Sequence, residues 1–386
     1  MEKFKTYILE ELTIGKGSYG IAAPAIPFNP SKHTYLRITD INDDGTLNKQ
    51  GLMSVDDENA SNYILKENDI VFARTGNSTG RSYFYDGADG ELVYAGFLIK
   101  FSIDKKKVNP RILKYYTHSK PYFNWVRSFD TGGTRGNINA KTYGTMPITL
   151  PSREVQDKIV SILKSLDDKI ELNRRINGNL EQQAQALFKA WFVDFEPFKD
   201  GKFVDSELGR IPEGWKVGQL DELVEIKYGK DHKKLLPGNI PVYGSGGIMR
   251  HVNMPIYEKE SVLIPRKGSL NNVLYVNHPF WTVDTMFYTR MKINGIAKFI
   301  YLFISPIDLL SMNNGSAVPS MTTEILSKIR LVIPSKNIFD NFESLVAPSF
   351  DKIGSCNKEI CKLSNLRDAL LPKLLSGELS INTITE

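Results

Sequence analysis

An internal repeat constrains this chain more than any other feature of its sequence. When the chain is shifted by 183 residues against itself, residues 150–192 and 333–375 share ten identities in 43 ungapped positions. Chance would give about two or three, so the two segments form a true repeat. Each copy begins with a Pro-Ser pair, at residues 151–152 and 334–335. The repeat predicts a fold with two similar halves.

The repeated segments have the pattern of long helices. Ser152 is a natural N-cap, and a heptad pattern follows it, with Asn173 at one seam position. The apolar members of this seam are Ile159, Ile162, Leu166, Ile176, Leu180 and Leu187. Forty helical residues would extend about 60 Å. In the second copy, Pro348 is expected to kink or split the helix near its start, and Pro372 marks its last turns.

The two helices either pair as a coiled coil or lie as core helices in a larger globule. The regular seam favours pairing, and it leaves open whether the pair is parallel or antiparallel.

A segment of similar layout precedes each helix. Both segments contain a short acidic motif (9–12 and 220–223), a Gly/Lys-rich loop (14–20 and 227–234) and a short strand that enters the helix. Within a strand-like run, three residues match without a gap: Arg74, Gly76 and Tyr83 match Arg266, Gly268 and Tyr275. Short β-rich runs between Gly and Asn turns indicate mixed α+β domains.

We therefore predict an α+β fold with two mixed α/β domains and two long spacer helices, related by a pseudo-two-fold repeat. The expected segments are a first domain (1–150), a central helix (151–195), a linker (196–212), a second domain (213–334) and a C-terminal helix with its tail (335–386).

Composition sets wide limits on function. The apolar fraction of 41% and the charged fraction of 24% are globular values. The net charge of +5 permits a polyanionic partner without requiring one. The sequence has no apolar run of membrane-spanning length and no signal-peptide pattern at its start, so we expect a cytoplasmic protein. Cys356 and Cys361 have neither metal-ligand spacing nor a disulfide framework.

Motifs that suggest catalysis are incomplete. Gly15, Gly17 and Gly20 form a GxGxxG pattern, but the other kinase motifs are missing. Residues 277–280 (NHPF) depart from the adenine methyltransferase signature, and no S-adenosylmethionine-binding unit precedes them. We therefore predict a non-catalytic chain without a metal site. A nuclease or methyltransferase with an unrecognised site is an alternative.

Three stretches together carry a family resemblance: LPSREVQDKIVSILKSLDDKIELNRRINGNLEQQAQALFKAWFVDFEPF, IPEGWKVGQLDELVEIKYG and LRDALLPKLLSGEL. They resemble the specificity subunit of type I restriction–modification systems, and the resemblance covers essentially the whole chain. It implies two target-recognition domains, each of which recognises one half of a split DNA sequence. Two antiparallel helices would set the gap between the halves and dock methyltransferase subunits.

The resemblance also implies partners and cofactors. Two methyltransferase (modification) subunits and additional restriction (motor/nuclease) subunits would bind this chain, and S-adenosylmethionine, ATP and Mg²⁺ would belong to those subunits. A stand-alone sequence-specific DNA-binding regulator is the alternative function.

Candidate DNA contacts are basic residues for phosphates and polar residues for base edges. In the first domain they are Arg74, Thr75, Asn77, Ser78, Thr79, Arg81, Arg135, Asn137, Asn139 and Lys141. In the second domain they are Lys230, His232, Lys233, Lys234, Tyr243, Ser245, Arg250, Arg266, Lys267, Ser269, Asn271 and Asn272. Each could also be a solvated loop residue, and the matched Arg74 and Arg266 could form a structural ion pair.

The end of the central helix offers a candidate surface for the partner subunit. Its residues are Leu187, Phe188, Trp191 and Phe192. They could equally be buried where the two helices cross.

Overall fold

The computed structural model describes residues 4–49, 51–129, 136–312 and 320–379. Contacts divide the chain into two compact units, unit 1 (Met1–Leu172 and Glu359–Glu386) and unit 2 (Asn173–Lys358). The division falls within both long helices, α4 (Arg153–Phe192) and α8 (Lys336–Ser376).

Unit 1 is built on two four-stranded sheets among its described residues. One has the order β2-β9-β6-β7 and the other β3-β5-β4-β8, while β1 and β10 form a separate antiparallel pair. The strands are β1 (Lys5–Ile8), β2 (Ser18–Tyr19), β3 (Ala25–Pro27), β4 (His33–Leu36), β5 (Met53–Val55), β6 (Asp69–Ala73), β7 (Ser82–Tyr85), β8 (Leu92–Tyr94), β9 (Leu98–Ser102) and β10 (Pro147–Leu150). The short helices are η1 (Leu9–Leu12), η2 (Ile38–Asp40), η3 (Ala60–Tyr63), η4 (Gly76–Ser78), α1 (Pro110–Tyr116), α2 (Lys120–Arg127) and α3 (Ala140–Gly144).

Unit 2 has a four-stranded sheet of order β14-β20-β17-β18, a three-stranded sheet β16-β15-β19, and the pairs β11–β12 and β13–β21. The strands are β11 (Phe203–Ser206), β12 (Gly209–Pro212), β13 (Lys216–Gln219), β14 (Val224–Tyr228), β15 (Ile240–Gly244), β16 (Gly247–Val252), β17 (Ser261–Pro265), β18 (Leu274–Val276), β19 (Trp281–Thr282), β20 (Met286–Met291) and β21 (Arg330–Ile333). The short helices are η5 (Glu196–Phe198), α5 (Leu220–Leu223), α6 (Ala297–Ile304) and α7 (Thr323–Ser327). The expected linker at 196–212 thus contains an ordered β-hairpin.

The two units repeat one plan. In both, an antiparallel strand pair joins the start of the domain to the strand that enters the long helix, β1 with β10 and β13 with β21. The acidic motifs form one helical turn in each unit, held alike: the Ile8 amide donates to Glu11 at 2.9 Å, and the Gln219 amide donates to Glu222 at 3.0 Å. The predicted α+β repeat is confirmed.

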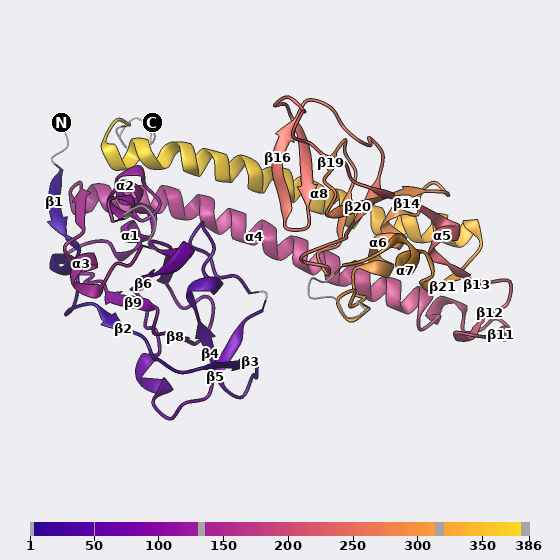
Figure 1. Ribbon diagram of the computed structural model, residues 1–386, viewed down its shortest axis with the longest axis horizontal. Coiled ribbons are helices and arrows are strands. Elements are labelled where there is room, and N and C mark those ends of the chain that lie inside the picture. Colours follow the sequence, from indigo (N-terminus) through magenta and orange to yellow (C-terminus); the bar gives the residue numbers. More distant parts are fainter. Residues whose placement is uncertain (1–3, 50, 130–135, 313–319, 380–386) are drawn as a thin grey trace. The chain divides into compact units, whose positions relative to one another are not determined.

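The long helices pack antiparallel within each unit (Figure 1). In unit 1, Ile159 and Leu163 near the start of α4 share a buried cluster with Leu371 and Leu374 near the end of α8. In unit 2 the ends are exchanged, and the ring of Phe192 from α4 lies 4.8 Å from the ring of Phe342 in α8. Burial of apolar surface at these contacts stabilises both helices.

The helix seam differs from the predicted one in its second row. Asn173 is buried as predicted, and its counterpart in the repeat, Cys356, is also buried. However, Ile162 and Ile176 are only half-buried, whereas Leu163 and Ile170 are fully buried. A heptad shifted by one residue in this row explains the difference, since 163 and 170 lie with 159 and 173 on one face.

Proline does not divide the second helix. α8 is continuous from Lys336 to Ser376, through both Pro348 and Pro372, so the expected split at Pro348 is wrong. Pro348 lies exposed, where the carbonyl that loses its amide partner can bind water instead.

Candidate nucleic-acid interface

In each unit, an inner strand of one four-stranded sheet is followed directly by an arginine. In unit 1, Arg74 follows the fully buried strand β6, and its amide donates to the Phe97 carbonyl at 3.1 Å. The Arg74 carbonyl accepts from Ile138 at 2.9 Å, and its guanidinium lies 5.0 Å from the centre of the Tyr19 ring. The Tyr19 hydroxyl accepts from the amide of Ala140, the first residue of α3, at 3.1 Å.

In unit 2, Arg266 has an equivalent position after its strand, with different residues around it. Arg266 follows the buried strand β17, donates from its amide to the Thr285 carbonyl at 2.8 Å and accepts from Met321 at 2.8 Å. Its guanidinium lies 5.4 Å from the centre of the Tyr228 ring, and the Tyr228 hydroxyl lies 3.5 Å from the hydroxyl of Thr323, the first residue of α7. We call Tyr19 with Arg74, and Tyr228 with Arg266, the Tyr–Arg pairs.

The Tyr–Arg pairs decide one question that the sequence left open. Neither Arg74 nor Arg266 forms an ion pair within the part of the chain that the structure describes. The shared arginine is therefore held by an aromatic ring and by main-chain bonds, rather than by a structural carboxylate.

Neither tyrosine of these pairs is among the residues predicted from the sequence. Tyr19 and Tyr228 fall inside the Gly/Lys-rich loops, and the available signal was the glycine after each, Gly20 and Gly229. A Cβ atom at Gly20 would lie 2.2 Å from the Tyr94 carbonyl oxygen, and one at Gly229 would lie 2.0 Å from that of Val283. Only glycine permits this close approach of two main chains.

Four of the first domain's candidates are buried or have internal partners: three lie in the loop after β6, and Asn139 precedes α3. The Thr79 hydroxyl donates to the Gly76 carbonyl at 2.8 Å, and the Asn139 side chain caps α3 through the Thr142 amide at 2.9 Å. Ser78 is buried. Arg81 forms an ion pair with Asp43 at 2.6 Å. The turn itself needs glycine, because the φ angle of Gly76 is +75°. The φ angle of its counterpart Gly268 is also positive, at +83°.

Other candidates of the first domain face outward. Asn77, Asn137 and Lys141 are exposed, and Thr75 is half-buried where it forms a β-bridge with Asn137. Arg135 lies outside the described residues. The structure thus brings Arg74, Thr75, Asn77 and Asn137 together at one end of the sheet.

In the second domain, four candidates have internal partners. Asn271 donates to Asp308 at 3.1 Å, Asn272 to the Ser245 carbonyl at 2.8 Å, and Arg250 to the Leu235 carbonyl at 2.6 Å. Tyr243 is buried, and its hydroxyl lies 3.1 Å from Nε2 of His278. Burial raises the pKa of Tyr243 to about 12, so its hydroxyl stays neutral at physiological pH.

The remaining candidates of the second domain leave a basic surface. The exposed ones are Lys230, Lys233, Lys234, Lys267 and Ser269. Ser245 and His232 are half-buried. The bond from Asn272 to Ser245 ties the turn between β15 and β16 to the loop after β17, so these loops lie side by side.

The candidate partner-docking residues lie in the core of unit 2. Phe188 and Phe192 are buried, and the Phe192 ring lies 4.8 Å from the ring of Phe299. Leu187 and Trp191 are partly buried against the same cluster. The structure supports burial at the helix crossing for these aromatic residues, and it does not support an exposed docking face.

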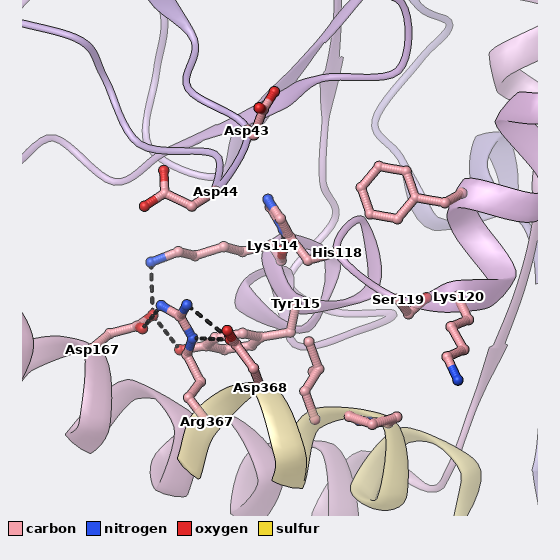
Figure 2. A pocket seen from close by; sticks show the side chains of 13 residues that line it. Asp43, Asp44, Lys114, Tyr115, His118, Ser119, Lys120, Asp167, Arg367 and Asp368 are labelled. Carbon is pink, nitrogen blue, oxygen red and sulfur yellow. Dashed lines mark hydrogen bonds and ion pairs between the residues drawn. The ribbon is translucent and has the colours of Figure 1, made fainter. Parts of the chain in front are cut away.

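A hollow of about 480 Å³ lies in unit 1 beside the two helices (Figure 2). Asp167 of α4 accepts from Lys114 at 2.9 Å and from Arg367 of α8 at 3.0 Å. Burial alone would raise the pKa of Asp167, but these two cations outweigh it and hold the pKa below its ordinary value. In the repeat the position of Asp167 is taken by Phe350 of unit 2, whose ring lies 5.9 Å from Tyr301. The charged groups of this network are paired with one another, and the network joins α1, α4 and α8.

The described residues contain neither a metal-binding cluster nor a membrane-spanning helix. No group of three His, Cys, Asp or Glu side chains in the described ranges is placed to hold a metal ion. No helix in these ranges combines the length and apolarity needed to cross a bilayer.

Comparison with known proteins identifies the family. A family model, "Type I restriction modification DNA specificity domain", matches residues 6–182 and 212–353. The chain is 29% identical over 310 residues to the type I restriction enzyme MjaIX specificity subunit of Methanocaldococcus jannaschii, covering 73% of this chain and 72% of the relative. It is 25% identical over 403 residues to the HindI specificity subunit of Haemophilus influenzae, covering 82% of this chain and 87% of the relative.

The fold is shared with a solved relative. The crystal structure of the type I restriction–modification system S subunit from M. genitalium superposes with a TM-score of 0.55 at 18% identity, over 97% of this chain and 96% of that chain. The matched family segments cover most of the sequence and include the first part of both copies of the repeat. The chain therefore belongs to the type I restriction–modification DNA specificity family.

Proposed function

We propose that this chain is the non-catalytic DNA-recognition subunit of a type I restriction–modification complex. Each domain recognises one half of a split DNA target, and the long helices set the gap between the halves. One observation carries the proposal: the same sheet and the same Tyr–Arg pair occur in both units, whereas the exposed residues beside them differ.

The differing residues are the proposed base contacts. Thr75 and Lys267 occupy matching positions after the arginine, and both form β-bridges, to Asn137 and Ser320 respectively. Asn77 and Ser269 match two residues later. Amide, hydroxyl and ammonium groups bond to different base edges, so one frame with different side chains recognises different half-sites.

The complex supplies the chemistry. Two methyltransferase subunits dock on this chain, restriction subunits join them for cleavage, and S-adenosylmethionine, ATP and Mg²⁺ bind to those partners. The proposed recognition domains are residues 1–150 and 213–334. The spacer helices are residues 151–195 and 335–386, the latter with the C-terminal tail. Residues 196–212 link the central helix to the second domain. The complex is proposed to act in the cytoplasm.

The test is to co-express the chain with its methyltransferase subunit in a host without DNA methylation, and to map methylated adenines across the genome. Two short defined sequences around a fixed undefined gap are the expected result. Methylation at an unbroken motif would contradict recognition in two halves. A stable complex without methylation would favour a DNA-binding role without modification. Sequence-specific DNA binding without any methyltransferase complex would favour the stand-alone regulator, and methylation or cleavage by the purified chain alone would favour an enzyme.

A further inference from the structure

We propose that the two Tyr–Arg pairs are copies of one phosphate anchor, which holds the DNA backbone irrespective of sequence and leaves base recognition to the neighbouring residues. This inference rests on the proposed function and assigns separate tasks within its DNA-binding surfaces.

The geometry of the pairs is the same although their surroundings differ. Each guanidinium lies over a tyrosine ring, at 5.0 Å in unit 1 and 5.4 Å in unit 2. The main chain of each arginine is fixed on both sides by backbone hydrogen bonds, to Phe97 and Ile138 or to Thr285 and Met321. The corner therefore depends on the backbone of the fold, which both units share.

The charge of each pair is uncompensated. Arg81 and Arg111 have carboxylate partners, Asp43 at 2.6 Å and Asp86 at 2.9 Å. Arg74 and Arg266 have none among the described residues. Nε of Arg74 is buried without a hydrogen-bond partner there, and Nη1 of Arg266 donates only to the main-chain carbonyl of Asp284 at 3.2 Å. A fixed guanidinium without a carboxylate is suited to accept a phosphate, which it can bind through two parallel N–H donors.

Both tyrosine rings remain partly exposed, although the Tyr228 ring also lies 5.0 Å from the ring of Phe287. Tyr19 is 42% exposed and Tyr228 is 51% exposed. An exposed ring beneath a guanidinium limits the orientations of that group through the cation–π interaction, so less conformational entropy is lost when an anion binds. The rings are therefore positioning residues for the arginines.

A group that is identical in both units cannot distinguish two different half-sites. The DNA backbone, in contrast, presents the same phosphates at each half. Phosphate contacts position a protein on DNA, whereas base-edge contacts specify the sequence. The identical pairs thus fit phosphate binding, and the differing Thr75, Asn77, Lys267 and Ser269 fit base recognition.

The experiment uses the full chain in complex with its methyltransferase subunits and three duplexes: the mapped target, that target with one half scrambled, and an unrelated sequence. Arg74→Ala and Arg266→Ala should each lower affinity for all three duplexes by about eightfold at 0.1 M salt, with unchanged ratios between duplexes. Each should lower the slope of log affinity against log salt by about 0.9, and Arg74→Lys, which keeps the charge, should restore the slope.

Arg111→Ala is the matched control, because Arg111 also contacts an aromatic ring, that of Phe84, but is neutralised by Asp86. It should leave the salt slope unchanged. Thermal unfolding identifies any misfolded variant, in which case Arg74→Gln and Arg266→Gln replace the alanine variants. A loss confined to the mapped target would show a base contact, and an unchanged slope would show a purely structural role; either result overturns the inference.

Failure of the proposed function looks different. If the wild-type complex has no preference for any split target, the proposed function fails. If the wild-type complex prefers the split target and the arginine variants equal it, only the phosphate anchor fails.

Discussion

At the scale of single residues, Asp167 joins three elements of unit 1. Its carboxylate is 15% exposed and bonds to Lys114, Arg367 and Tyr115. Asp167→Asn should lower the free energy of unfolding by about 2 kcal/mol at pH 7, because two cations lose their shared partner. Denaturant unfolding measures this difference.

The pH dependence of this effect follows from the lowered pKa of Asp167. A carboxylate whose folded pKa is lowered stabilises the fold above its unfolded pKa, near 3.8, and loses that contribution as pH falls through the folded value. The difference between wild type and Asp167→Asn should therefore shrink below about pH 4. The neighbouring Asp168→Asn is the control, because the exposed pair of Asp168 with Lys164 contributes less than about 0.5 kcal/mol. A difference that stays constant down to pH 3, or an equal loss in the control, would contradict this account.

Gly20 gives a second prediction at this scale. A Cβ atom at position 20 would approach the Tyr94 and Ala95 carbonyl oxygens to 2.2 and 2.3 Å, so Gly20→Ala should destabilise the protein by about 3 kcal/mol. Gly178→Ala in α4 meets no atom within 4 Å and should stabilise the protein by about 1 kcal/mol. Thermal unfolding of both variants is the measurement, and equal melting temperatures would disprove the close approach at Gly20.

At the scale of elements, the sequence predicts the position of the long helices well, and it predicts less well which of their residues are buried. The Pro-Ser start and the heptad are local patterns, so the helix and the buried Asn173 can be predicted from them. Whether Ile162 or Leu163 is buried depends on the position of the partner helix, and a local sequence pattern does not contain that information. The same limit applies to the site. The loop after β6 can be predicted from the sequence, but the Tyr19 ring lies near Arg74 only because β2 and β6 belong to one sheet.

Replacing Pro348 tests whether α8 is a continuous helix. Its ring occupies an exposed interior position of the helix, where it removes one hydrogen bond to the carbonyl of Ser344. Pro348→Ala should restore that bond and stabilise the protein by about 2 kcal/mol, measured by denaturant unfolding. A loss of stability would mean instead that the helix depends on a bend at this residue.

At the scale of the whole molecule, the central claim is that each domain recognises its own half of the target. The sequence predicts two similar domains because the repeat is written along the chain. It does not tell which loop residues remain free, since internal partners of Arg81, Asn271 and Asn272 appear only in the folded structure.

The most direct measurement is methylation mapping with paired variants of the two domains. One variant carries Thr75→Ala and Asn77→Ala, and the other carries the matching Lys267→Ala and Ser269→Ala, each co-expressed with the methyltransferase subunit. The account predicts that the first variant relaxes or alters only one half of the methylated motif and the second only the other half, with the gap unchanged. Changes in both halves from one variant, or a change in the gap, would contradict it.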